Sequence, residues 1–240
     1  MTKILIVGTG GREYAIAKLL SETLEYSDIE FIKTTENYFI SKFGKILNFI
    51  KIHEFEKIFT HILNPKVNLI IFGPEATLKT GLQDYLKDKL KEHNISNVKI
   101  LAPSFKHSQL ELSKIYARNF VEEFNPDMNP KFHVITNLND YHNIPKLFPN
   151  LQKFVYKPDG LTGGKGVKFV NSEDEILKNI DQNYLIEEKL EGIEFSLICL
   201  KTEYEPIFSP ILQDYKHVSA TEAKNTGGMG CTSGYFNFLS

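Results

Sequence analysis

Apolar and polar positions alternate in blocks along residues 3–102. Mostly apolar stretches of strand length occupy residues 3–8, 29–33, 46–49, 67–72 and 98–101. Between these runs, apolar residues recur every three or four positions and predict amphipathic helices over residues 12–24, 53–63 and 81–92. Strands that alternate with helices pair in parallel through right-handed crossovers. The pattern therefore predicts an α/β unit with an open, doubly wound parallel sheet.

The pattern changes after Pro103. A long amphipathic helix is predicted over residues 107–124, and the segment 125–130, Asn-Pro-Asp-Met-Asn-Pro, breaks it and indicates a linker. A second unit is expected from Phe132, with a strand, a helix over 138–147, a glycine-rich loop, a helix over 173–181 and a strand over 184–189. A β-rich part should begin near Gly192.

The glycine-rich loop carries the strongest chemical signal. It runs from Lys157 to Val167, reads Lys-Pro-Asp-Gly-Leu-Thr-Gly-Gly-Lys-Gly-Val, and lies between two strand-like runs. Glycines let backbone N–H groups approach phosphate oxygens closely, and Lys157 and Lys165 add positive charge. No Gly-Lys-Ser/Thr opens a helix, so this is not a Walker A loop. The segment predicts a hairpin lid over a nucleotide, with an ordinary glycine-rich turn as the alternative.

A second glycine-rich turn, Gly8-Thr9-Gly10-Gly11-Arg12-Glu13, joins the first strand to the first helix. A helix N-terminus of this kind favours an anion. The third glycine of the dinucleotide motif is replaced by Glu13, and the second strand ends without the acidic residue that would bind an adenine ribose. A smaller phosphate-bearing ligand is expected, or a tight turn without a ligand. Glu75, after the strand 67–72, should face the same crevice.

Two weaker signals lie farther along the chain. The connector that follows the strand 184–189 could offer backbone groups to an adenine edge, and Glu194 could accept hydrogen bonds from ribose hydroxyls. Residues 225–230, Asn-Thr-Gly-Gly-Met-Gly, predict another glycine-rich loop. Solvated acidic residues and a flexible turn are the alternatives.

Composition narrows the class of protein. The 240 residues are 42% hydrophobic and 24% charged, with a net charge of −2, which is typical of a globular protein and gives no argument for nucleic acid or an anionic membrane. No apolar run approaches ~20 residues, so no transmembrane helix is expected. Cys199 and Cys231 give neither a disulfide framework nor a metal spacing, and we expect reduced thiols in a cytoplasmic protein.

Seven motifs, taken in order along the chain, resemble those of the phosphoribosylamine–glycine ligases, or glycinamide ribonucleotide synthetases. They are GTGGRE, GPE, SK in the 107–124 helix, KPDGLTGGKGV, IEEKLEGIEFS, QDYKH and NTGGMG. These are ATP-grasp enzymes of purine synthesis, and the resemblance covers essentially the whole chain. It implies an N-terminal substrate-binding α/β domain followed by ATP-grasp α+β units whose C-terminal part is truncated. The implied boundaries are 1–103 for the first domain, 104–130 for the connecting helix and linker, 131–191 for the lid subdomain and 192–240 for an incomplete β-rich core.

The resemblance also implies roles for individual residues. The residues implied for ATP phosphates and the closing lid are Lys114, Lys157, Gly163, Gly164, Lys165 and Gly166. Glu187 and Leu190 would hold the adenine, and Glu194 the ribose. The residues implied for the phosphoribosylamine crevice are Gly10, Gly11, Glu13 and Glu75. Those implied near the acyl-phosphate chemistry are Asp214, Lys216, Asn225, Thr226, Gly227 and Gly228, so that Lys157, Lys165, Asp214 and Lys216 would be catalytic.

The implied substrates are ATP, glycine and 5-phosphoribosylamine, with Mg²⁺ or Mn²⁺ as the metal. ATP would phosphorylate the glycine carboxylate, and the amine of phosphoribosylamine would attack the acyl phosphate. Catalysis would rest on neutralisation of charge by Lys157, Lys165 and the metal.

Several positions depart from the family pattern. Thr9 and Tyr14 replace Asn and His, Thr34–Asn37 replace a Pro-Gly-Asn-Ala-Gly loop, and Asp214–His217 read Asp-Tyr-Lys-His in place of Asp-His-Lys-Arg. The chain ends where the family continues with its metal-ligating Glu and Asn, so no metal ligands are assigned here, and a partner chain could supply the missing half. We expect the chain alone to bind ATP weakly and to form little product. The alternatives are a different ATP-grasp carboxylate–amine ligase and a non-catalytic nucleotide-binding module.

Overall fold

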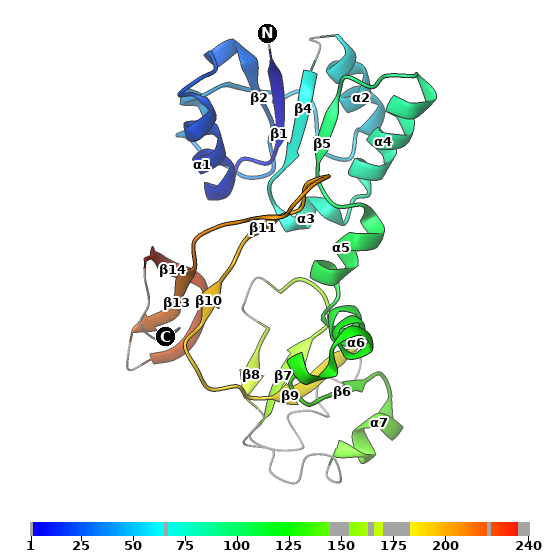
Figure 1. The fold of residues 1–240 in the computed structure, drawn as a ribbon, viewed down its shortest axis with the longest axis vertical. Helices are drawn as coiled ribbons and strands as arrows, with labels where there is room; N and C mark the ends of the chain where they lie inside the picture. The colour runs from blue at the N-terminus through cyan, green and yellow to red at the C-terminus, as the bar shows by residue number, and fades with distance from the viewer. Residues whose placement is uncertain are drawn as a thin grey trace. The chain divides into compact units, whose positions relative to one another are not determined.

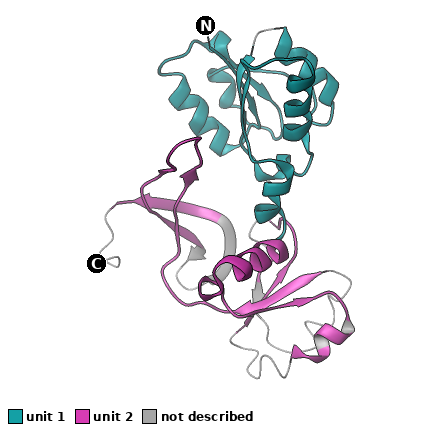
Figure 2. Cartoon of the chain, turned by 45° about the vertical axis from the view of Figure 1, so that its right-hand side comes forward, with its two compact units in different colours: residues 1–113 teal, residues 114–240 magenta. Residues whose placement is uncertain are grey.

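The computed structural model describes residues 2–64, 67–144, 154–162, 166–169, 183–219 and 222–234. The chain divides into two compact units, residues 1–113 and 114–240 (Figures 1 and 2). The segment after Pro103 contacts α3 (Glu75–Leu78) and belongs to the first unit as far as Ser113.

The first unit contains the parallel sheet that the sequence predicts. Its strands are β1 (Lys3–Val7), β2 (Ile29–Ile32), β3 (Lys45–Ile46), β4 (Val67–Phe72) and β5 (Lys99–Leu101). They lie in the order β3-β2-β1-β4-β5, and every neighbouring pair is parallel. The order of strand addition reverses between β1 and β4, which is where ligands bind in open α/β sheets.

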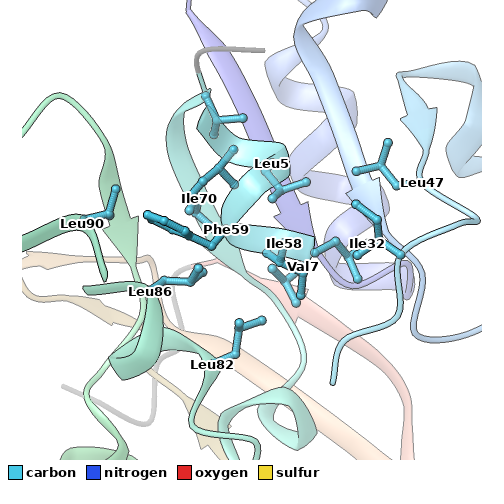
Figure 3. Close-up of a cluster of buried hydrophobic side chains, with 13 residues drawn as sticks. Leu5, Val7, Ile32, Leu47, Ile58, Phe59, Ile70, Leu82, Leu86 and Leu90 are labelled. Atoms are coloured by element: carbon cyan, nitrogen blue, oxygen red, sulfur yellow. The ribbon is translucent and has the colours of Figure 1, made fainter. Parts of the chain in front are cut away.

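Helices cover both faces of this sheet, as expected for a doubly wound fold. The helices are α1 (Gly11–Leu20), α2 (Phe55–Leu63), α3, α4 (Leu82–Glu92) and α5 (Phe105–Leu112), with short 3₁₀ turns at Tyr26–Asp28 and Ile40–Lys42. On one face, Ile58 and Phe59 of α2 and Leu86 of α4 pack against Leu5 and Ile70 of the sheet (Figure 3). On the other, Ala17 of α1 packs in a second buried apolar cluster.

The predicted helix over residues 107–124 is wrong in one respect. It is two helices, α5 and α6 (Lys114–Phe124), separated by Ser113, whose backbone is extended at φ −133° and ψ 116°. The start of α6 is held by the loop after the strand Phe154–Pro158, since the Ile115 N–H donates to Asp159 Oδ1 at 3.2 Å. A single extended residue leaves the apolar spacing on either side intact, so periodicity alone does not reveal the break.

The second unit begins with a four-stranded antiparallel sheet in the order β6-β9-β7-β8. Its strands are β6 (Phe132–Ile135), β7 (Phe154–Pro158), β8 (Lys168–Phe169) and β9 (Tyr184–Glu188). The pairing of β7 with β8 confirms the predicted hairpin around the glycine-rich loop. A 3₁₀ turn (Pro126–Met128) lies in the predicted linker, and α7 (Leu138–His142) follows β6. The predicted helix over 173–181 lies outside the described residues.

The two faces of this sheet have different characters. Tyr156 of β7 and Ile186 of β9 are paired and belong to a buried apolar cluster with Ile135. The next residues along each strand, Lys157 and Glu187, point to the opposite face, because side chains alternate along a strand. Helix α6 contacts β9 and supplies the partners of Glu187 described below.

The remaining strands form an antiparallel sheet in the order β10-β13-β14 and a separate two-stranded ladder. They are β10 (Phe195–Ser196), β13 (Leu212–Ser219), β14 (Glu222–Ser233), β11 (Cys199–Leu200) and β12 (Ile207–Phe208). The predicted loop at 225–230 is wrong, because these residues lie within β14. Register shifts between β13 and β14 and a φ of +131° at Gly228 accommodate the glycines within the ladder.

Within the residues that the structure describes, no helix has both the length and the apolar character needed to cross a membrane. Cys199 and Cys231 are free and exposed, which agrees with the expectation of thiols.

Candidate active site

The turn after β1 and the loop after β4 pack tightly at the switch point of the parallel sheet. The Gly8 N–H donates to the Ile32 carbonyl at 3.0 Å, and the Gly73 N–H donates to the Val7 carbonyl at 3.1 Å. Gly8 has φ +129°, and a Cβ atom there would lie 2.5 Å from Pro74 Cδ. Glycine is therefore required at Gly8 both by its backbone angle and by the close approach of Pro74.

Glu13, which the resemblance places in the substrate crevice, is buried with 1% exposure. Its Oε2 accepts the Gly10 N–H at 2.5 Å, so the Glu13 side chain satisfies the backbone donor that precedes α1. A Cβ atom on Gly73 would lie 2.5 Å from Glu13 Cγ and closer still to the carboxylate. The Glu13 side chain therefore holds the glycine turn through the Gly10 N–H and packs closely against Gly73.

Arg12 and Glu75 lie on the exposed side of the same turn. The Arg12 guanidinium donates to the Gly73 carbonyl and lies 3.4 Å from Glu75 Oε2. Both side chains remain accessible, at 62% and 42% exposure. The structure thus brings the first turn, with Gly10 and Gly11, and Glu75 to one edge of the sheet.

The turn after β1 and the loop after β2 contact each other. The buried Thr9 Oγ1 accepts the N–H groups of Thr34 and Thr35 at 3.2 and 3.1 Å. The Thr9 N–H in turn donates to Thr34 Oγ1 at 3.2 Å, and the Asn37 amide donates to the Gly10 carbonyl at 3.3 Å. The loop at residues 34–37 is therefore hydrogen-bonded directly to the turn after β1.

A cavity of about 410 Å³ opens beside this loop. It is lined by Lys33, Thr34, Thr35, Glu36, Asn48, Ile50 and Lys51. Lys33 forms an ion pair with Glu36, so part of the positive charge in the lining is already offset.

In the second unit, a three-residue charge cluster forms between α6, β7 and β9, on the face of the sheet that bears Lys157. Arg118 of α6 donates to both oxygens of Glu187, with Nε to Oε2 at 2.9 Å and Nη2 to Oε1 at 3.2 Å. The Lys157 ammonium of β7 donates to Glu187 Oε1. Glu187 is buried with 3% exposure. We call Arg118, Lys157 and Glu187 the charge cluster.

The two cations determine the ionisation of Glu187. Burial raises the pKa of the Glu187 carboxyl, but hydrogen bonds from Arg118 and Lys157 and the charges of both outweigh burial and leave the pKa below its usual value. Glu187 is therefore an anion at neutral pH, and the charge cluster carries one more positive than negative charge.

Lys114 lies one helical turn before Arg118 on α6, and residues four apart share a helix face. Its ammonium donates to the carbonyl oxygens of Pro158, at 3.1 Å, and Gly160. Lys114 and Lys157 therefore lie at the same end of β7, beside the glycine-rich hairpin. Among the lid residues, Gly163, Gly164 and Lys165 lie outside the described residues. Gly166 follows a close turn, since a Cβ atom there would lie 2.8 Å from three side-chain atoms of Thr162.

The remaining predicted residues gather on the β10-β13-β14 sheet and the connector before it. Leu190 follows β9 and is 71% exposed. Glu194 forms an ion pair with Lys216, and the Ser196 hydroxyl donates to Asp214 Oδ2 at 2.6 Å. Residues 225–228, with Asn225, Thr226, Gly227 and Gly228, belong to β14.

Sequence reasoning missed Arg118 as a site residue. The signal was present, because Arg118 is one of only two arginines in the chain and lies four positions after Lys114. Among the described residues, no group of three His, Cys, Asp or Glu side chains could hold a metal ion.

Comparison with models of known protein families shows which family the two units belong to. Residues 2–111 match the family model described as phosphoribosylglycinamide synthetase, N domain, and residues 112–240 match its ATP-grasp (A) domain. The chain belongs to the phosphoribosylglycinamide synthetase family. The junction of the two domain models lies next to the break between α5 and α6.

Relatives and solved structures agree with this family. The phosphoribosylamine–glycine ligase of Methanococcoides burtonii is 29% identical over 240 residues, which cover 96% of this chain and 53% of the relative. The crystal structure of the ligase from Thermotoga maritima is 24% identical, with a TM-score of 0.70, and the match covers 96% of this chain and 55% of that one. The chain thus spans about half the length of the curated relatives it matches.

The fold is shared more widely. N5-carboxyaminoimidazole synthetase of Staphylococcus aureus, solved with ADP, matches with a TM-score of 0.59 and 15% identity over 90% of this chain and 55% of that one. The fold is therefore the mixed α/β architecture of the ATP-grasp proteins, with a parallel sheet followed by antiparallel sheets.

Proposed function

We propose that this chain forms the phosphoribosylamine-binding and nucleotide-binding parts of a phosphoribosylamine–glycine ligase. The enzyme would join glycine to 5-phosphoribosylamine and convert ATP to ADP and phosphate, a step of purine synthesis. The observation that carries the proposal is the placement of Lys114 and Lys157 at one end of β7, within a chain whose two parts match the two family domains in order.

The residues around β7 suit a polyphosphate. Lys157 and Lys114 would contact the ATP phosphates, and the hairpin with Gly163, Gly164, Lys165 and Gly166 would close over them. The Glu187 backbone is paired on both sides, with β6 and β7, so we assign the adenine edge to the exposed connector at Leu190 and keep Glu187 as the carboxylate beside Lys157. Glu194 would accept hydrogen bonds from the ribose. The ADP bound to the Staphylococcus aureus relative supports a nucleotide in this fold.

The proposed chemistry has two steps. A glycine carboxylate oxygen attacks the γ-phosphorus of ATP, and ADP leaves. The amine nitrogen of phosphoribosylamine then attacks the carbonyl carbon of glycyl phosphate, the C–O bond to phosphate breaks, and the nitrogen loses a proton. Lys157 and Lys165 would stabilise the negative charge of the transferring phosphoryl group. Magnesium or manganese would accompany ATP and offset further phosphate charge.

The substrate crevice is assigned to the first unit. The N-terminus of α1 at Gly10 and Gly11 and the accessible Arg12 guanidinium suit the phosphate of phosphoribosylamine, and Glu75 suits its hydroxyl or amine groups. Asp214, Lys216 and the β14 residues 225–228 would act near the acyl phosphate. Glu13 would act indirectly, by holding the turn.

The test is an assay of ADP release from ATP, with magnesium, glycine and freshly generated phosphoribosylamine. In a ligase of full family length that contains these residues, the proposal expects ADP release that depends on glycine and is accompanied by glycinamide ribonucleotide, whereas the 240-residue chain alone should form little product. Nucleotide binding without glycine-dependent release in the full-length ligase would support the non-catalytic module instead. Release that depends on another acid or amine would support a different ATP-grasp ligase.

A further inference from the structure

The charge cluster contains a cation that the proposed function does not use. Arg118 and Lys157 both donate to Glu187 Oε1, so one buried carboxylate serves two cations. The side chain of Glu187 is only 4% exposed, whereas those of Arg118 and Lys157 are 27% and 23% exposed. Water can solvate the two cations in part, but it hardly reaches the Glu187 carboxylate. The negative charge of Glu187 therefore depends on Arg118 and Lys157 for its stabilisation more than either cation depends on Glu187.

A bound nucleotide would compete with the Glu187 carboxylate for the Lys157 ammonium. An ammonium that donates to a phosphate gives up some or all of its contact with a carboxylate. A buried carboxylate left without a cation pays a large desolvation penalty, so a lone Glu187 would oppose the transfer of Lys157 to a ligand. With Arg118 in place, Glu187 keeps a two-point, charge-assisted partner after Lys157 moves.

Arg118 is anchored independently of Lys157. Its Nη1 lies 3.4 Å from Asn129 Oδ1, and Asn129 Nδ2 donates to the Arg118 carbonyl at 2.9 Å. The same Asn129 amide donates to Glu122 Oε2 at 2.9 Å. These contacts link Arg118 to the end of α6 and the following linker, and none of them involves β7.

We propose that Arg118 is a positioning residue that holds Glu187 in place and so frees Lys157 to exchange from that carboxylate to a nucleotide phosphate. The proposal rests on the proposed function, in which Lys157 contacts ATP. It distinguishes the two cations by role: Lys157 exchanges partners and Arg118 does not. The planar guanidinium suits the fixed role, because it binds both carboxylate oxygens at once, whereas an ammonium is a point charge.

If Arg118 holds Glu187 in place, a second substitution at Glu187 should restore the ATP affinity that is lost when Arg118 is replaced. Arg118→Met leaves Glu187 with Lys157 as its only partner in the charge cluster, so ATP affinity should fall about tenfold, the scale of one lost charge-assisted interaction. Glu187→Gln removes the competitor and should leave affinity equal to or tighter than that of the unsubstituted chain. The double variant Arg118→Met/Glu187→Gln should recover most of the affinity lost in Arg118→Met. Arg118→Lys should lie between Arg118→Met and the unsubstituted chain.

The measurement is ATP titration calorimetry on the 240-residue chain, with thermal unfolding recorded for each variant. Lys89→Met, which removes one lysine of a surface ion pair with Glu92, is the control for loss of charge. A purely structural Arg118 would give affinities that follow thermal stability, with the double variant at least as weak as Arg118→Met. That result would overturn the inference.

A second readout keeps this inference separate from the proposed function. If the unsubstituted chain binds no ATP, the proposed nucleotide site fails, but the competition for Lys157 can still be measured by acetic anhydride labelling and mass spectrometry. Relative to the exposed Lys18, Lys157 should acetylate more slowly in Arg118→Met and recover in the double variant, since a sole carboxylate partner holds the ammonium more firmly. Equal labelling of Lys157 in all variants would contradict the role of Arg118.

Discussion

Thr9 Oγ1 donates to the Thr35 carbonyl at 2.6 Å, while it accepts the backbone N–H groups of Thr34 and Thr35. One buried hydroxyl therefore binds the loop after β2 to the glycine turn after β1. These hydrogen bonds couple the two segments at the edge of the sheet nearest β2.

Thr9→Val tests that coupling, because valine has nearly the same shape and lacks the hydroxyl. It leaves two N–H groups and one carbonyl without their buried partner, and we expect a loss of about 1–3 kcal/mol in the free energy of unfolding. Urea unfolding measures it, with Thr23→Val at an exposed position as the control. Equal stability of the two variants would show that Thr9 does not hold the loop. Thr9→Ser should retain most of the stability.

Gly73→Ala tests the close contact between the β4 loop and Glu13. A Cβ atom at Gly73 overlaps the Glu13 side chain, so we expect a loss of about 1–3 kcal/mol, the scale of an overpacked buried site. Glu13→Ala removes the overlapping atoms, so the double variant should lose less stability than the sum of the single variants. Gly11→Ala, where an added Cβ meets no atom within 4 Å, is the control. Additive losses in the double variant would rule out the contact.

Acid stability should depend on Glu30, which lies between His61, at 2.7 Å, and Lys3, at 3.4 Å. Burial raises the pKa of the Glu30 carboxyl, but the hydrogen bonds and charges of His61 and Lys3 outweigh burial and lower the pKa below 4.5. Because the folded pKa lies below the unfolded value, the stabilisation is present above about pH 4.5 and is lost as pH falls through the folded pKa.

Glu30→Gln should therefore differ from the unsubstituted chain at neutral pH by about 1–3 kcal/mol, and the difference should shrink as the pH falls through the folded pKa of Glu30. Urea unfolding at a series of pH values measures it. Glu92→Gln, at the exposed ion pair with Lys89, is the control. A difference that stays constant with pH would mean that Glu30 is not an ionised partner of His61 and Lys3.

Most of the fold could be predicted because its elements are locally encoded. Strand β4 is apolar except at Asn68 and matches its predicted bounds, Val67–Phe72. Helix α4 has an apolar face that is buried against the sheet, and its period was plain in the sequence. By contrast, the break at Ser113 depends on Asp159, which lies far along the chain. The glycines of residues 225–230 predict a loop because glycine disfavours strands, and pairing with β13 places these residues in β14.

The candidate site was only partly predictable for a related reason. The glycines and lysines of residues 157–167 predict a phosphate site from residue type and spacing alone. The role of Arg118 depends on which face of β9 carries Glu187, and the buried position of Glu13 depends on the approach of Gly73. Such relations arise from strand pairing and packing, which a single sequence does not specify.

Titration calorimetry of ATP against Lys157→Ala tests whether the Lys157 ammonium contacts the nucleotide. The exposed Lys201→Ala serves as the matched control in the same unit. We predict that Lys157→Ala weakens binding by about 1.5–3 kcal/mol, the scale of a lost charge-assisted hydrogen bond, while Lys201→Ala changes little. Equal ATP affinity in Lys157→Ala and the unsubstituted chain would contradict the account.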